Sequence, residues 1–120
     1  MKDKWEHRRA RMMPQHSRME LAVMTRLLGA GVKPLLTEQT YELHDNERVV
    51  HTTPDFCLHD SAVSIYIDGP VHNKHEMRDK YIRELLRQQH GRHVIAVSYT
   101  RFSGRETERV FNKIMEALPK

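Results

Sequence analysis

Residues 54–69 read Pro-Asp-Phe-Cys-Leu-His-Asp-Ser-Ala-Val-Ser-Ile-Tyr-Ile-Asp-Gly, which is two short apolar segments around a polar turn. A tight turn centred on Asp60-Ser61 pairs residues whose numbers sum to 121. The apolar side chains then face each other on one side of a β-hairpin, and a turn one residue longer or shorter would break this agreement. The predicted apolar pairs are Phe56 with Ile65 and Leu58 with Val63.

The opposite face of this predicted hairpin is polar. In the same register Asp55 faces Tyr66, and Asp68 lies next along that face. Paired carboxylates on adjacent strands provide the hard oxygen donors that a divalent cation prefers. We therefore predict that Asp55 and Asp68 bind Mg²⁺ (or Mn²⁺).

Helical periodicity predicts three helices around the hairpin. Ser17 begins the first, with a capping-box spacing to Glu20, and Gly29 and Gly31 end it. The second runs from Asn73 to about Gln89, and the third from Arg105 to Leu118. Their predicted apolar stripes are, in order, Val23, Met24, Leu27 and Leu28; Met77, Tyr81, Ile82, Leu85 and Leu86; and Val110, Phe111, Ile114 and Met115.

The remaining strands are predicted from alternation and β-branched residues. Segments 35–43 and 49–53 form a strand pair around a polar turn, and 93–98 is a buried strand. The strand–helix–strand step over 62–98 predicts a right-handed parallel crossover. The order is helix, three antiparallel strands, helix, strand, helix, which is an α/β sandwich around a central mixed sheet.

Charge is zoned along the chain of 120 residues, whose net charge is +4. Residues 1–18 carry a net +4, residues 19–68 a net −5 and residues 69–120 a net +5. Residues 1–15 are predicted as a basic N-terminal arm and 16–120 as one catalytic domain. Basic zones beside an acidic cluster favour a polyanionic partner, although ordinary scatter of surface charge remains the alternative.

Several classes of protein are excluded by composition. The single cysteine excludes a disulfide framework and a Cys-rich zinc site. No apolar run approaches the roughly 20 residues of a membrane span, and the charged N-terminus lacks the apolar region of a secretory signal. We expect a cytoplasmic or nucleoid-associated protein with no membrane partner.

Three further residues are candidates for chemistry. Glu20 falls near the middle of the first apolar stripe, so its carboxylate is predicted to point into the protein. His72 lies at the corner between strand and helix, and Asp79 lies about two turns into that helix. A purely structural role stays open for each residue. Glu20 could belong to a capping box, His72 to a solvated helix start, and Asp79 to an i, i+4 ion pair with Arg83.

The chain contains Pro54-Asp55-Phe56, then the predicted hairpin, then Ile67-Asp68-Gly69 and His72. This motif resembles the Vsr-like endonucleases of the PD-(D/E)XK restriction-endonuclease-like superfamily. The resemblance covers roughly residues 16–118 and is closer to the EDxHD homing type than to the mismatch nickases, whose structural zinc site is built largely from cysteines. It implies the restriction-endonuclease-like αβββαβα sandwich and a Mg²⁺-dependent endodeoxyribonuclease, of homing or nickase type.

The resemblance also implies roles. Glu20, Asp55, His72 and Asp79 would be catalytic, with Asp55 the central metal ligand, Asp68 lining the metal and the carbonyl of Ile67 a further ligand. Physically, a histidine that titrates near neutrality could move the proton of the attacking water or of the leaving group. The predicted nucleic-acid contacts are Lys74, Arg78, Arg83, Arg8, Arg9 and Arg11.

The chain departs from the superfamily pattern at Tyr66-Ile67-Asp68, which lacks the first acid and the lysine of the acidic-x-Lys step. Two alternatives therefore stay open: a catalytically decayed nucleic-acid-binding module and a small metal-dependent RNase. A zinc site at His72 and His75 is a weaker one. DNA is the predicted partner, with RNA not separated from it, and recognition of a long site would need a homodimer or a fused or partner domain.

Overall fold

The computed structural model describes residues 17–35, 39–58, 61–70 and 76–119 of the chain. Within these residues it contains three helices and five strands, an α/β fold. The elements are, in order, α2 (Ser17–Gly29), β1 (Tyr41–Asp45), β2 (Arg48–Thr52), β3 (Phe56–Cys57), β4 (Val63–Asp68), α3 (Glu76–His90), β5 (His93–Ser98) and α4 (Gly104–Ala117).

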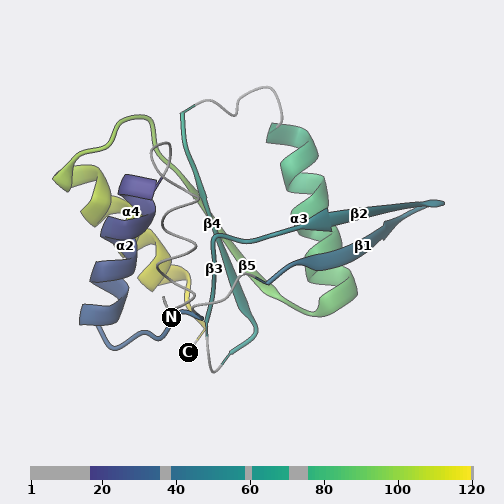
Figure 1. Ribbon diagram of the computed structural model, residues 1–120, viewed down its shortest axis with the longest axis horizontal. Coiled ribbons are helices and arrows are strands. Elements are labelled where there is room, and N and C mark those ends of the chain that lie inside the picture. Colours follow the sequence, from purple (N-terminus) through teal and green to yellow (C-terminus); the bar gives the residue numbers. More distant parts are fainter. Residues whose placement is uncertain (1–16, 36–38, 59–60, 71–75, 120) are drawn as a thin grey trace, which may run out of the picture.

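The central sheet has the strand order β3-β4-β5 (Figure 1). Strands β3 and β4 are antiparallel and pair Phe56 with Ile65, which confirms the predicted hairpin register. Strand β5 runs parallel to β4 and pairs Ile95 with Ile65, which confirms that the predicted strand–helix–strand step joins parallel strands. The predicted mixed sheet therefore exists, and its register fixes where Asp68 lies at the end of β4.

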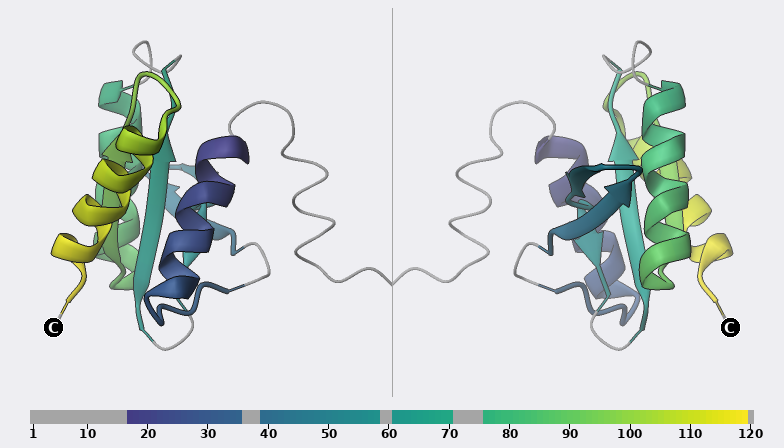
Figure 2. Two further views of the ribbon diagram at one scale, coloured as in Figure 1. Left: turned by 90° about the vertical axis from the view of Figure 1, so that its left-hand side faces the viewer. Right: turned by 90° about the vertical axis from the view of Figure 1, so that its right-hand side faces the viewer.

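Helices cover both faces of this sheet (Figure 2). Helices α2 and α4 pack on one face, and α3 covers the other. Alternate residues of β4 supply the two cores: Ile65 and Ile67 belong to the cluster shared with α2 and α4, whereas Tyr66 belongs to the cluster with Leu86 of α3. Because β4 is buried on both faces, it reads as an almost continuous apolar run.

Strands β1 and β2 form a separate two-stranded sheet, which differs from the predicted run of three antiparallel strands. The hairpin leaves the central sheet and packs against α3, beyond which it projects (Figure 1). Leu43 is fully buried there, and Gln89 of α3 bonds both the N–H and the carbonyl of His44. Alternation along the sequence predicted these strands but not the surface that buries them.

Three residues of the predicted apolar stripes are exposed instead. Met77 is 85% exposed because it lies in the first turn of α3, and Leu28 is 55% exposed at the margin of the α2 stripe. Tyr81 is 46% exposed, and its hydroxyl donates a 2.6 Å hydrogen bond to Asp45 of the hairpin. Part of the predicted apolar stripe of α2 and of α3 is therefore exposed to solvent.

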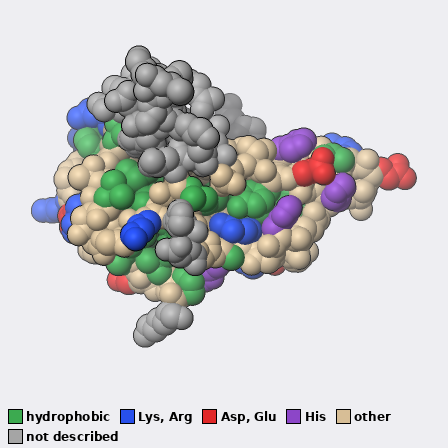
Figure 3. All heavy atoms as spheres, turned by 60° about the horizontal axis from the view of Figure 1, so that its bottom comes forward, with side chains coloured by type: hydrophobic (Ala, Val, Ile, Leu, Met, Phe, Trp, Pro, Cys, Tyr) green, Lys and Arg blue, Asp and Glu red, His purple; other side chains and the backbone are tan. Residues whose placement is uncertain are grey.

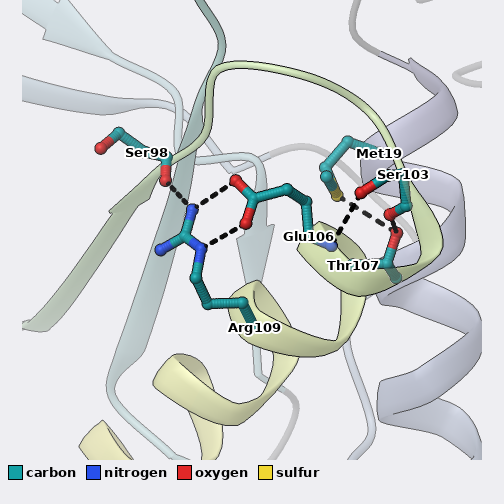
Figure 4. A network of polar contacts seen from close by, with 6 residues as sticks. All are labelled: Met19, Ser98, Ser103, Glu106, Thr107 and Arg109. Atoms are coloured by element: carbon teal, nitrogen blue, oxygen red, sulfur yellow. Dashed lines mark hydrogen bonds and ion pairs between the residues drawn. The ribbon is translucent and has the colours of Figure 1, made fainter.

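A polar network ties the start of α4 to β5 (Figure 4). Ser103 caps the helix, since its hydroxyl accepts a 3.0 Å hydrogen bond from the backbone N–H of Glu106. Thr107 donates to the carbonyl of Ser103 at 2.9 Å. Arg109 bonds both oxygens of Glu106 and donates to the carbonyl of Ser98 at 2.7 Å.

Among the helices in the described part of the chain, none has the length and apolar character needed to cross a membrane.

Candidate functional site

Asp55 meets the last residues of β4, as the hairpin register predicts. One oxygen of its carboxylate accepts a 2.6 Å hydrogen bond from the backbone N–H of Ile67. Asp68 is the next residue along the strand. The two predicted metal-binding residues are therefore neighbours at one end of the central hairpin, and Asp55 is half-buried there.

The side chain of Asp68 forms an ion pair with a residue of α3. Arg83 donates to its two oxygens at 2.8 Å and 2.7 Å, which is the bidentate geometry of a strong ion pair. The guanidinium of Arg83 also lies over the ring of Tyr66, 4.2 Å from its centroid. Burial lowers the pKa of Arg83, but the hydrogen bonds and charge of Asp68 outweigh this effect and raise it.

Tyr66, which stands where the predicted resemblance would call for an acid, is buried on the α3 face. Its hydroxyl shares a 2.6 Å hydrogen bond with Thr52 of β2, so it joins the hairpin sheet to the central sheet. Burial raises the pKa of Tyr66. The tyrosine therefore gives this position a packing role and supplies no carboxylate.

Glu20 is buried at 4% exposure on α2, in agreement with its predicted inward orientation. Burial, and then the negative charges of Glu20 and Asp55, raise the pKa of the Tyr99 hydroxyl. The backbone N–H of Tyr99 donates to the carbonyl of Asp68 at 3.0 Å. This bond places Tyr99 at the sheet end that carries Asp68.

Asp79 lines a cavity of about 490 Å³ between α3 and the sheet. The carboxylate of Asp79 is near enough to Arg83 for its charge to raise the pKa of that arginine, yet the hydrogen bonds of Arg83 go to Asp68. The other polar residues that line the cavity are Asp68, Glu76, Lys80, Arg83, Glu84, Arg87 and Ser98.

The predicted site residues consequently divide between the two faces of one sheet end. Glu20 approaches from the α2 face, whereas Asp68 and Asp79 lie on the α3 face. Asp55 lies beside the strand end, where its charge influences both Tyr66 and Tyr99. Because α2 and α3 pack on opposite faces of the sheet, the site residues that these two helices carry do not share one face.

Several predicted residues fall outside the described part of the chain, so their roles stay predictions. These residues are His72, His75, Lys74, Arg8, Arg9 and Arg11.

A second polar group lies on the exposed face of the β1–β2 hairpin. The carboxylate of Glu42 lies 3.8 Å from His44 and 3.9 Å from His51. Figure 3 shows histidine and acidic side chains gathered toward the narrow end of the molecule. Neither here nor elsewhere in the described ranges do three or more His, Cys, Asp or Glu side chains form a group that could hold a metal ion.

Tyr99 and the capping network of α4 are the features that the sequence predictions missed. A signal for Tyr99 existed in its position directly after the buried strand 93–98, at the sheet end that carries Asp68.

No protein-family model, no curated protein and no solved structure matches this chain. The resemblance to Vsr-like endonucleases therefore stays a prediction.

Proposed function

We propose that the protein is a metal-dependent endonuclease that hydrolyses phosphodiester bonds in DNA. The observation that carries the proposal is the position of Asp55, whose carboxylate is fixed by the N–H of Ile67 at the end of β4. Glu20 is a second carboxylate, and it is buried on α2. Carboxylate oxygens are the ligands that a hard divalent cation prefers.

Some of the acidic residues at this sheet end have the chemistry to bind a magnesium or manganese ion. Asp55 and Glu20 would provide oxygen ligands, whereas Asp68 would join them only if Arg83 released it. When bound, such an ion stabilises the charge that develops on the scissile phosphate. The hydrogen bond from Ile67 keeps the Asp55 carboxylate in one orientation before substrate arrives.

Binding of a polyanion is supported by the basic residues of α3. Arg78, Lys80 and Arg87 are exposed on this helix, and Lys80 and Arg87 line the cavity. Lys80 and Arg87 each have a glutamate neighbour, Glu76 and Glu84 respectively. Arg78 lies near enough to Asp45 of the hairpin for their charges to interact, and it is the exposed arginine that we propose to bind a phosphate outside the cavity.

Incubation of the protein with labelled DNA and labelled RNA, with Mg²⁺, Mn²⁺ or a chelator, tests the proposal. Cleavage of DNA that requires the divalent ion is the expected result. Cleavage restricted to RNA would replace the deoxyribonuclease with a ribonuclease.

A second candidate is a nucleic-acid-binding module that has lost catalysis. Two observations favour this second candidate. Tyr66 stands in place of an acid, and the carboxylate of Asp68 is bound by Arg83. Binding of oligonucleotides without cleavage under any metal condition would support this second candidate over the nuclease.

A further inference from the structure

We infer that Asp68 anchors helix α3 to the end of β4 through Arg83 and is not a ligand of the cation. The statement about the cation rests on the proposed function. The anchoring role does not, because it follows from the contacts of the two side chains.

Both carboxylate oxygens of Asp68 are already engaged by Arg83, which limits their use as ligands of a cation. Both of its oxygens accept hydrogen bonds from the planar fork of Arg83, at 2.7 Å and 2.8 Å. The guanidinium already neutralises the carboxylate, and it would repel a divalent ion brought against the same oxygens. One oxygen of Asp55, by comparison, accepts a hydrogen bond from the backbone N–H of Ile67.

The surroundings of Arg83 oppose its release. Its side chain is 14% exposed and that of Asp68 is 26% exposed. The guanidinium stacks 4.2 Å from the centroid of Tyr66, which is itself held by Thr52. A charge that loses its partner in such surroundings is strongly destabilising, so an exchange of Arg83 for a metal ion would carry this cost.

The pair has a positional consequence for the cavity. Arg83 lies one helical turn after Asp79, and both residues line the same cavity. By holding Arg83 to the strand end, Asp68 fixes the part of α3 that presents Asp79. Asp68 is therefore a positioning residue that acts through Arg83.

Four variants of the full chain separate the two roles: Asp68→Asn, Arg83→Gln, the double variant, and Asp55→Asn. The melting temperature without metal measures anchoring, and Mn²⁺ binding followed by electron paramagnetic resonance measures ligation. Glu84→Gln is the matched control, because its partner Arg87 forms an exposed ion pair on the same helix. Arg83→Lys keeps the charge without the fork and should recover part of the stability.

We expect Asp68→Asn and Arg83→Gln each to lower the melting temperature by about 10 °C. The melting temperature of the double variant should fall by much less than the sum of the two single decreases, since neither charge is then left unpaired. Asp68→Asn should leave the affinity for Mn²⁺ within about threefold of wild type, whereas Asp55→Asn should weaken it about tenfold or more.

A loss of Mn²⁺ affinity in Asp68→Asn equal to that in Asp55→Asn would overturn the inference, as would additive losses in the double variant. If the wild type binds no Mn²⁺, the proposed function fails, but the melting temperatures still decide on the anchor. Non-additive decreases in melting temperature would support the anchoring role of Asp68, and additive decreases would contradict it.

Discussion

The carboxylate of Asp55 and the backbone N–H of Ile67 are joined by a hydrogen bond of 2.6 Å, which closes the open end of the β3–β4 hairpin. This contact explains how a residue outside the regular strand keeps a defined position beside Asp68. It also directs the backbone donor of Ile67 toward a charge, which strengthens the bond relative to one between neutral groups. The candidate site is therefore built on the hairpin that fixes the fold.

Replacing Leu43 with alanine should loosen the β1–β2 hairpin from α3. Leu43 is fully buried against Leu86 and Tyr66, so we expect a loss of about 2–5 kcal/mol in the free energy of unfolding. Val49→Ala on the same hairpin is the control, because Val49 is 49% exposed and should change stability by less than about 0.5 kcal/mol. Urea denaturation measures both, and equal effects would show that the hairpin does not pack on α3 as described.

Removing the cap of α4 should have a moderate effect. Ser103→Ala deletes the hydroxyl that accepts the N–H of Glu106, and we expect a loss of about 1 kcal/mol in the free energy of unfolding. Ser103→Asn retains a capping oxygen and should stay close to wild type. If alanine and asparagine are equally stable at this position, the hydroxyl does not act as a cap.

Arg78→Ala should weaken binding to a DNA duplex and reduce the dependence of the binding constant on salt. Loss of one phosphate contact lowers the slope of log K against log[salt] by about 1. Lys113→Ala on α4 is the matched control because that exposed residue lies on the other side of the sheet. Fluorescence anisotropy at several salt concentrations measures the slopes, and identical slopes for the two variants would contradict a contact at Arg78.

The ion pair between Glu106 and Arg109 should contribute to stability only above acidic pH. The hydrogen bond from Arg109 lowers the pKa of Glu106 in the folded protein. A carboxyl with a lowered folded pKa stabilises the fold above its unfolded pKa, and this contribution is lost as the pH falls through the folded pKa.

We therefore expect thermal stability to fall between roughly pH 5 and pH 3, and Glu106→Gln to fall less steeply than wild type. Glu116→Gln, at an exposed position on the same helix, should follow the wild-type curve. A Glu106→Gln curve that is parallel to the wild type would show that the pair does not stabilise the fold.

Local pattern was sufficient to predict the elements and the register of the central hairpin. The pairing of Phe56 with Ile65 follows from turn length and alternation, and both are visible in residues 54–69. The parallel neighbour 93–98 follows from its apolar run and from the helix that links it to β4. The edge that carries Asp55 and Asp68 could therefore be predicted from sequence.

Contacts between distant elements could not be predicted in the same way. Arg83 has Asp79 as its local partner at i−4, yet it pairs with Asp68, because the packing of α3 on β4 sets which acid it reaches. Likewise, alternation predicted the strands of the β1–β2 hairpin, but only the burial of Leu43 shows that they pack on α3. Rotation of a helix on a sheet depends on the whole core, which no short window of sequence contains.

The most direct test of the proposed nuclease is cleavage of supercoiled plasmid DNA by wild type, Asp55→Asn and Glu47→Gln, each with Mg²⁺ or Mn²⁺ and with a chelator. Glu47 is an exposed acid at the tip of the β1–β2 hairpin, so its variant controls for the loss of one negative charge. We predict divalent-dependent nicking or linearisation by wild type and Glu47→Gln, and a loss of about 100-fold or more in Asp55→Asn. Cleavage by Asp55→Asn at the wild-type rate, or none by wild type with either ion, would contradict the account.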